Sequence, residues 1–157
     1  MNSTAAPNRF AWPPLIYLAA IIAGIALTVV YPLPWITAPL SDILFAAGWL
    51  LVFSGFALNI SALRTLRRAN TTMRPDRPSD HLVTSGPFSF TRNPIYLGNT
   101  MLTIGIGLVT ESLWFLLFAL IAAFATQKLA IEGEERHLEA KFGKKYRDYR
   151  ARIRRWI

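Results

Sequence analysis

The sequence predicts an all-α, polytopic membrane protein with four transmembrane helices and a C-terminal amphipathic cytoplasmic helix. Of its 157 residues 53% are hydrophobic, although the net charge is +8. The charges are segregated: Asp42 is the only charged residue between Ala11 and Ala62, and every basic residue except Arg9 follows that block. Apolar blocks that alternate with basic blocks are typical of chains that cross a bilayer several times. The length favours a single domain, residues 1–157.

The first two spans are predicted at about residues 15–31 and 42–63. A secretory signal is the alternative interpretation of the first stretch. Only Arg9 precedes it as a positive residue, and no A-x-A-like cleavage site follows it. We therefore favour a retained helix. The second stretch has about 20 residues, enough to cross ~30 Å of hydrocarbon.

Two further apolar stretches, 94–109 and 113–131, are the predicted third and fourth spans. The third contains Gly98, Gly105 and Gly107, and such glycines let a neighbouring helix or a ligand come close. A tight turn separates the two stretches. Four spans result, with an even number of membrane crossings between the two ends of the chain.

The arginines give the predicted orientation. The loop 64–92 and the C-terminal segment hold many of them, whereas the turns 31–41 and 110–112 hold none. The positive-inside rule then places both termini in the cytoplasm. Because the loops are compact, we expect a bacterial chain in the inner membrane. The basic excess faces anionic headgroups there, so membrane lipids rather than nucleic acid are the expected partners.

Residues 132–157 form a segment of different character. Six apolar or aromatic residues recur at spacings of three and four, which is one stripe of a helix. They are Leu138, Phe142, Tyr146, Tyr149, Ile153 and Trp156. Basic residues fill the other faces, so the segment is predicted to be an amphipathic helix at the membrane surface or packed on the spans. Gly143 is expected to divide it into two pieces.

The loop 80–93 gathers turn-forming residues, aromatics and an arginine directly before the third span. Gly86-Pro87 cannot continue a regular element. Asn93-Pro94 is typical of an N-cap followed by proline at the first helical position. A helix start of this kind can hold an anionic group. The alternative is an ordinary capped loop that enters a membrane helix.

Charged and polar residues near the predicted cytoplasmic ends of the spans are the candidates for chemistry. Glu134 and Glu135 follow the fourth span, where charge is costly unless it is solvated or paired, and Arg92 is their natural partner on the same side. A solvated helix start is the alternative for the glutamates, and a headgroup anchor for the arginine. His81 has no clustered ligands and the chain has no cysteine, so we predict no metal site and a hydrogen-bonding role for His81.

The third span also carries a polar face, formed by Tyr96, Asn99 and Thr100 with Asn93 one turn earlier. Such a face in an apolar helix suggests a lined cavity. Tyrosine near a helix start is also an ordinary interfacial anchor, so both interpretations stay open for Tyr96.

Two ordered motifs carry a resemblance to a known family. The first is H-L-V-x-x-G-P-F-x-x-x-R-N-P-x-Y-x-G, and the second is E-E-x-x-L-x-x-x-F-G-x-x-Y-x-x-Y after a helical pair. Together they resemble the isoprenylcysteine carboxyl methyltransferase and phospholipid methyltransferase superfamily of small integral-membrane enzymes. The resemblance covers residues 81–152, nearly half of the chain.

The resemblance implies an S-adenosylmethionine site on the cytoplasmic side, built from the loop before the third span and the glutamates after the fourth. By position, the implied cofactor-binding residues are His81, Leu82, Val83, Gly86, Pro87, Phe88, Asn93, Pro94, Tyr96, Gly98, Glu134 and Glu135. Arg92 and Arg152 correspond to arginines near the acceptor, and Glu135 is a third candidate for a catalytic role. The chain departs from the usual pattern at Phe88, Asn93 and Arg154, where the family usually has tyrosine, histidine and often proline.

The implied activity is methyl transfer from S-adenosylmethionine to a lipophilic acceptor. A carboxylate acceptor needs only a cation that orients it, whereas an amine must first lose a proton, for which Glu135 or His81 would serve. We expect an isoprenylcysteine-carboxylate-like reaction. The alternatives are phospholipid amine N-methylation, methylation of small hydrophobic thiols or acids, a non-catalytic lipid-binding scaffold, and a sterol-type reductase that uses a nicotinamide cofactor.

Overall fold

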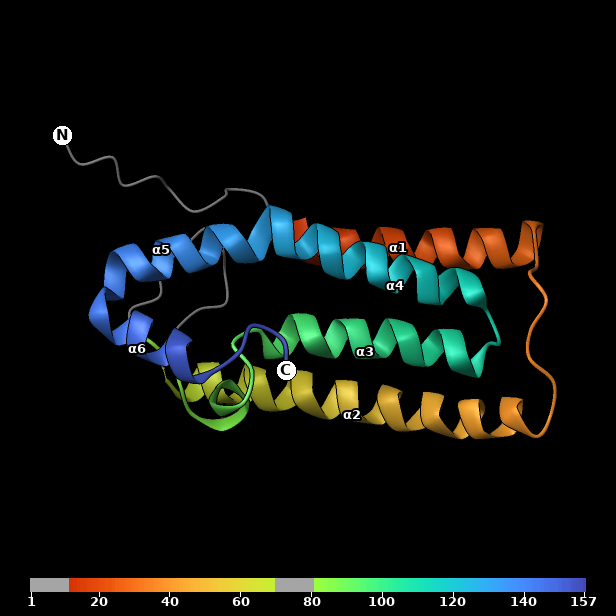
Figure 1. Cartoon of the computed structure of the whole chain (residues 1–157), viewed down its shortest axis with the longest axis horizontal. Helices are drawn as coiled ribbons and strands as arrows, with labels where there is room; N and C mark the ends of the chain where they lie inside the picture. The colour runs from red at the N-terminus through yellow and green to blue at the C-terminus, as the bar shows by residue number, and fades with distance from the viewer. Residues whose placement is uncertain (1–11, 70–80) are drawn as a thin grey trace.

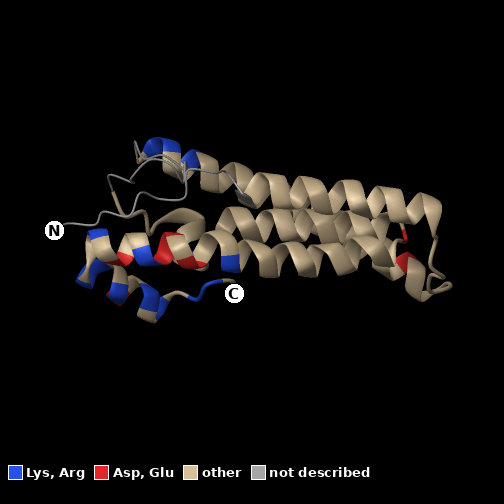
Figure 2. Cartoon of the chain, turned by 90° about the horizontal axis from the view of Figure 1, so that it is seen from above, with Lys and Arg blue, Asp and Glu red and all other residues tan. Residues whose placement is uncertain are grey.

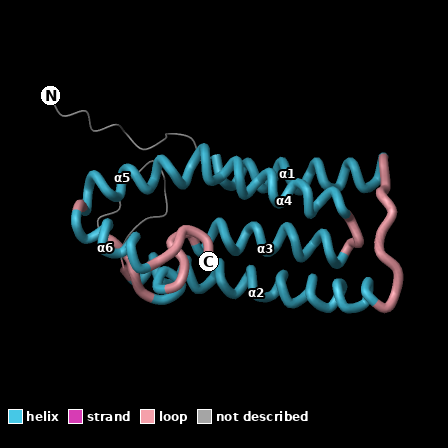
Figure 3. The backbone as a smooth tube through the Cα atoms, in the orientation of Figure 1, coloured by secondary structure: helices cyan, strands magenta, loops and turns pink. Residues whose placement is uncertain are grey.

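The computed structural model describes residues 12–69 and 81–157, and these parts of the chain form an all-helical bundle (Figure 1). The elements are α1 (Trp12–Val30), α2 (Leu40–Arg68), a short 3-10 turn η1 (Gly86–Ser89), α3 (Pro94–Val109), α4 (Leu113–Thr126), a π-helical turn η2 (Gln127–Ile131), α5 (Glu132–Phe142) and α6 (Lys144–Arg152). No strand occurs in these described ranges (Figure 3). The predicted all-α class is confirmed for the described ranges. Arg74 and Arg77 of the predicted loop 64–92, and Asp80 at the start of the predicted loop 80–93, lie outside the described residues.

Four long helices lie side by side in the order α2, α3, α4, α1 (Figure 1). Three stretches are long and apolar enough to cross a membrane, namely Pro13–Val30, Leu40–Arg68 and Leu113–Phe142. Helix α3 is apolar but has only 16 residues, about 24 Å at the rise of an α-helix, against ~30 Å of hydrocarbon. The chain is an integral membrane protein with three candidate spans among the described residues, and the fourth span stays a prediction.

Helix α2 ends at Arg68 and not at residue 63 as expected, so the first basic residues of the predicted loop belong to the helix. Arginine is a good helix former, and a cation in the last turn interacts favourably with the helix dipole. A helix can therefore continue past the point where charged residues begin and the chain leaves the bilayer.

Helices α2 and α3 approach closely because glycines face each other along their contact. A Cβ on Gly105 would lie 2.8 Å from the carbonyl oxygen of Gly48 and 3.0 Å from the backbone nitrogen of Val52. A Cβ on Gly98 would collide with Asn59 and would lie 3.0 Å from the carbonyl oxygen of Gly55. These glycines thus accommodate a neighbouring helix, as small residues do between membrane helices.

Polar side chains join the helices across the bundle. The Tyr17 hydroxyl of α1 lies 2.6 Å from Thr100 Oγ1 of α3, and Asn59 of α2 donates to Asn99 Oδ1 at 3.0 Å. The polar face expected to line a cavity is therefore used, at Asn99 and Thr100, for hydrogen bonds between helices. Such bonds satisfy polar groups that water cannot reach inside the bundle.

Helix α4 continues through η2 into α5 without interruption, so the helical path expected to end at residue 131 ends at Phe142. Glu134 and Glu135 therefore lie within a continuous path and not at a solvated helix start. The predicted break at Gly143 is confirmed, because its φ of +53° ends α5 and begins a second short helix, α6. The amphipathic membrane-surface role of this segment stays a prediction.

The charged residues of the described chain gather at one end of the bundle, on the end of α2 and on α5, α6 and the residues after them (Figure 2). The central part of the helices is nearly free of charge in the same view, and acidic residues mark the opposite end (Figure 2). We call the charged end the basic end. This separation matches the charge segregation of the sequence.

Candidate active site

An ion-pair centre of one glutamate and two arginines lies at the basic end. Glu135 Oε1 is 3.1 Å from Arg92 Nη1, and it also accepts a hydrogen bond from Arg155 Nε at 2.9 Å. Glu135 Oε2 accepts from Arg155 Nη2 at 2.8 Å. The side chains of Arg92 and Glu135 are each only 9% exposed. Because a buried charge is tolerated only when it is paired and hydrogen-bonded, this centre is a specific and energetically costly arrangement.

Three distant parts of the sequence meet in this centre. Arg92 stands in the loop directly before α3, Glu135 in the first turn of α5, and Arg155 after α6. Figure 1 shows the chain after α6 returning to the start of α3. The predicted pairing of Arg92 with the glutamates is confirmed, and it involves Glu135.

Two buried tyrosines of α6 connect the helix to the loop before α3. Arg92 Nη1 donates to the Tyr146 hydroxyl at 3.2 Å, and the Tyr149 hydroxyl donates to the Phe88 carbonyl at 2.7 Å. Their rings lie 6.3 Å apart, centroid to centroid. Burial raises the pKa of Tyr149 to about 12. Burial, followed by the nearby Glu135 charge, also raises the pKa of Tyr146, so both hydroxyls keep their protons at neutral pH.

Glu134 has a separate partner. The Tyr96 hydroxyl donates to Glu134 Oε1 at 2.7 Å, which links α3 to α5. Tyr96 therefore makes an internal hydrogen bond at the start of α3 and is not a simple interfacial anchor. The two adjacent glutamates thus bind different partners: Glu134 accepts from Tyr96, whereas Glu135 pairs with Arg92 and Arg155.

The start of α3 differs in one respect from the expected cap. Asn93 occupies the N-cap position and Pro94 the first helical position, but the Asn93 side chain makes no capping hydrogen bond. Its Nδ2 donates instead to the Arg155 carbonyl at 2.9 Å. The Asn93 side chain thus binds the residues after α6 and does not cap α3.

Gly86 has a structural reason to be glycine. Its φ is +60°, and a Cβ would lie 2.7 Å from Thr65 Oγ1 of α2. The turn η1 that it begins packs on α2, and Pro87 is buried there. The turn brings Phe88 to Tyr149, so these residues shape the loop.

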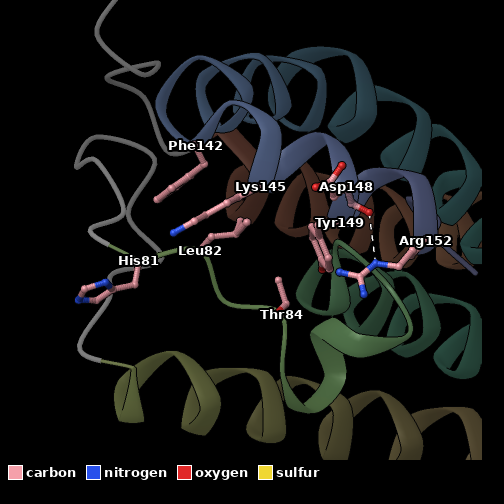
Figure 4. A pocket seen from close by; sticks show the side chains of 8 residues that line it. All are labelled: His81, Leu82, Thr84, Phe142, Lys145, Asp148, Tyr149 and Arg152. Atoms are coloured by element: carbon pink, nitrogen blue, oxygen red, sulfur yellow. Dashed lines mark hydrogen bonds between the residues drawn. The ribbon is translucent and has the colours of Figure 1, made fainter.

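An open pocket of about 520 Å³ lies between the start of the loop and α6. Its lining residues are His81, Leu82, Thr84, Phe142, Lys145, Asp148, Tyr149 and Arg152. Figure 4 shows Lys145, Tyr149 and Arg152 facing the loop segment that carries Leu82 and Thr84. Arg152 Nε donates to the Asp148 carbonyl at 3.3 Å. The pocket thus combines cationic, anionic and aromatic groups, and Tyr149 connects it through Tyr146 to the ion-pair centre.

Apart from Gly98, the predicted site residues fall into three groups. Arg92, Tyr96, Glu134 and Glu135 lie at the ion-pair centre or beside it. His81, Leu82 and Arg152 line the open pocket, with Val83 next in the chain and partly buried. Gly86, Pro87, Phe88, Asn93 and Pro94 shape the loop. Gly98 lines neither the centre nor the pocket, because it packs against α2 at Gly55 and Asn59.

Residues that sequence reasoning missed contribute as much as those it found. Arg155 forms the bidentate pair with Glu135, and Tyr146, Tyr149, Lys145 and Asp148 face the loop or the pocket. The tyrosines were recognised as part of an apolar stripe and of the second motif, and no hydrogen-bonding role was predicted for them. The signal that could have separated them is the regular i, i+3 placement of two hydroxyl-bearing rings on a stripe that is otherwise apolar.

One buried donor of the centre has no partner in the described structure. Arg92 Nε is buried and makes no hydrogen bond, although buried donors are nearly always satisfied. Within residues 12–69 and 81–157, no group of three or more histidines and acidic residues gathers as a metal site requires.

Comparison with known proteins gives a family match. The family model described as phospholipid methyltransferase matches residues 43–145, more than half of the chain. The nickel-cobalt-cadmium resistance protein NccN of Alcaligenes xylosoxydans xylosoxydans is 39% identical over 77 residues, which are 48% of this chain and 35% of that protein. The cobalt-zinc-cadmium resistance protein CzcN of Cupriavidus metallidurans is 36% identical over 66 residues, 42% of this chain and 31% of that protein. The chain spans about a third of the length of these curated relatives. No solved structure matches it.

Proposed function

We propose that this chain, which belongs to the phospholipid methyltransferase family, transfers the methyl group of S-adenosylmethionine to a lipophilic acceptor at the cytoplasmic face of a bacterial inner membrane. Methyltransferase activity in general follows from the family. The observation that carries the finer proposal is the meeting of the loop before α3 with the carboxylates of α5 at the basic end. Arg92 Nη1, at the end of the loop, lies 3.1 Å from Oε1 of the buried Glu135, although the two residues are distant in sequence.

The residues of the open pocket fit S-adenosylmethionine, which carries a carboxylate, an ammonium, a sulfonium and an adenine ring. Lys145 and Arg152 would pair with the carboxylate, and Asp148 would face a cationic group. The rings of Phe142 and Tyr149 offer surfaces for the adenine or the sulfonium. The volume of about 520 Å³ falls in the range of small-molecule sites, roughly 300–1,000 Å³.

When bound, S-adenosylmethionine supplies an activated methyl group. The chain's own residues then need to bind and orient the acceptor and to exclude water. Arg92, held by Glu135 and Tyr146, presents its unpartnered Nε at the centre, where it would orient an anionic acceptor. The exposed apolar faces of the bundle would admit the acceptor's tail from the bilayer.

A carboxylate acceptor of the isoprenylcysteine type suits this inventory because it arrives deprotonated. A phospholipid amine must lose a proton, and two of the nearby carboxylates are already engaged: Glu135 with two guanidinium groups and Glu134 with the Tyr96 hydroxyl. His81 and Asp148 at the pocket are the remaining candidate bases. A carboxylate held by two cations is a weak base. The arrangement thus favours a carboxylate over an amine as the methyl acceptor.

The test is incubation of the purified protein with methyl-labelled S-adenosylmethionine and a bacterial lipid extract. We expect label in a lipophilic product, and alkali should release it as volatile methanol if the product is a methyl ester. Label that resists alkali would indicate an N-methylated amine or an S-methylated thiol instead and would overturn the choice of acceptor. Label no higher than with Glu135→Gln protein would contradict the enzymatic proposal and favour a lipid-binding scaffold.

A further inference from the structure

The residues after α6 run back along the loop that begins α3, and we call residues 153–157 the strap. The Arg92 backbone N–H donates to the Arg154 carbonyl at 3.0 Å. Thr91 Oγ1 and Asn93 Nδ2 both donate to the Arg155 carbonyl, at 3.2 Å and 2.9 Å. Ile153 adopts extended backbone angles, with φ −115° and ψ 128°. The strap is therefore bonded to three consecutive residues of the loop, through one backbone and two side-chain hydrogen bonds.

A further contact fixes the strap on its other side. Trp156 Nε1 donates to Gln127 Oε1 at 2.9 Å, which ties the strap to the π-helical turn η2. Turns of this type often occur at functional sites within helices. The strap thus joins the loop before α3 to the helical path that carries the glutamates.

Arg155 makes the decisive side-chain contact of the strap. Its guanidinium binds both oxygens of Glu135, at 2.9 Å and 2.8 Å, whereas Arg92 reaches only Oε1. The hydrogen bond to Glu135 also raises the pKa of Arg155. Without Arg155, the Glu135 carboxylate would be held through one oxygen and would be free to rotate away from Arg92. Bidentate arginine–carboxylate pairs are strong and set a defined orientation.

We propose that Arg155 is a positioning residue, which acts through Glu135 to hold Arg92 in the orientation that the reaction requires, and that the strap closes the basic end around them. This inference rests on the proposed function, in which Arg92 and Glu135 belong to the reaction site. Arg155 acts by fixing Glu135 and needs no contact with donor or acceptor. Its loss should therefore lower kcat more than it changes KM, because orientation matters most in the transition state.

The first experiment compares Arg155→Ala with Arg154→Ala in the full chain in detergent. Arg154 is the matched control, because its side chain is exposed and its described contact is made by its backbone carbonyl. We expect Arg155→Ala to lower kcat by about tenfold or more, the effect of losing one or two charge-assisted hydrogen bonds. Arg154→Ala should stay within about twofold of the wild type.

A conservative variant and a double variant separate positioning from mere folding. Arg155→Lys keeps the charge but cannot bind both oxygens in a fork, so its kcat should lie between those of the wild type and Arg155→Ala. In a Glu135→Gln background, Arg155→Ala should cause little further loss, because the two residues act as one unit. Additive losses in the double variant would overturn the claim that Arg155 acts through Glu135.

A readout independent of activity is hydrogen exchange at the Arg92 amide, which donates to the strap. Arg155→Ala should speed this exchange at least about tenfold, whereas Arg154→Ala should leave it unchanged. If the wild type binds no S-adenosylmethionine, the proposed function fails, and the exchange result still decides whether Arg155 holds the strap. Identical exchange and identical kcat in the two variants would overturn the inference.

Discussion

The middle of the bundle and its basic end are built by different physics. In the middle, α2 and α3 are held by backbone-to-backbone approach at Gly48, Gly55, Gly98 and Gly105, with few polar groups. At the basic end, helices and loop are held by a buried ion-pair centre, two tyrosine hydroxyls and the strap. Helix packing in the middle and the geometry of the basic end therefore depend on separate residues, so variants should be able to damage one without the other.

The largest expected effect is in the middle of the bundle. Gly105→Leu adds atoms where even a Cβ would lie 2.8 Å from a backbone oxygen of α2, so the two helices must move apart. We expect a loss of roughly 1–3 kcal/mol or more in unfolding free energy, measured by thermal unfolding in detergent. Gly133→Ala is the matched control, because only the Arg136 guanidinium comes within 4.0 Å of its added Cβ. Equal melting temperatures for the two variants would show that the α2–α3 contact is looser than described.

At the basic end, Glu135→Gln and Arg92→Ala should each lower methyl transfer well over tenfold while the protein stays folded in detergent. Each change removes one partner of a buried pair that is 9% exposed on both sides, and a buried charge without its partner loses its fixed geometry. Glu139→Gln is the control, since that carboxylate forms an exposed pair with Arg150. Near-normal turnover of both site variants would remove the centre from the reaction.

A smaller effect is expected for Tyr149→Phe, which removes the hydrogen bond to the Phe88 carbonyl. The loss should be about 1 kcal/mol of unfolding free energy near neutral pH. Because the folded-state pKa is raised to about 12, above the unfolded value of about 10, the contribution is complete below pH 10 and is lost as the pH rises through about 12. Melting curves at pH 7, 9 and 11 should show a gap between wild type and variant that is constant at first and narrower at pH 11. A gap that widened at pH 11 would contradict this assignment.

The smallest effect is expected for the exposed pair Arg150–Glu139, in which the side chains are 50% and 37% exposed. Arg150→Ala should change the unfolding free energy by about 0–0.5 kcal/mol, because water and salt screen such pairs. The comparison with Arg155→Ala in the same assay isolates the effect of burial. A loss as large as that of Arg155→Ala would mean that charge in general, and not the buried centre, stabilises the basic end.

Much of the fold could be predicted because the responsible signals are local. The apolar stretch 94–109 coincides with α3, and Gly143 separates α5 from α6 as expected. The end of α2 was missed because arginines were taken to mark the end of a helix, whereas they mark only the end of the bilayer. The continuity of α4 with α5 was missed because a change of composition does not require a break in the backbone.

The candidate site could be predicted only in part. The motif order placed Arg92 and Glu135 together, since both were expected at the cytoplasmic ends of spans. Arg155 was beyond reach, because one arginine among several in the same segment has no local feature that marks it as the buried one. Arg155 reaches Glu135 because the strap folds back onto Asn93 and Gln127, which are distant from it in sequence. Sequence periodicity carries no information about such a contact.

The most direct test of the account is calorimetric titration of the wild-type protein in detergent with S-adenosylmethionine, with NADPH titrated in parallel. We expect saturable binding of S-adenosylmethionine at one site per chain, weakened by Arg152→Ala at the pocket, and no binding of NADPH. Absence of saturable binding of S-adenosylmethionine, or preferential binding of NADPH, would contradict the assignment of the basic end as the site of a methyl transfer.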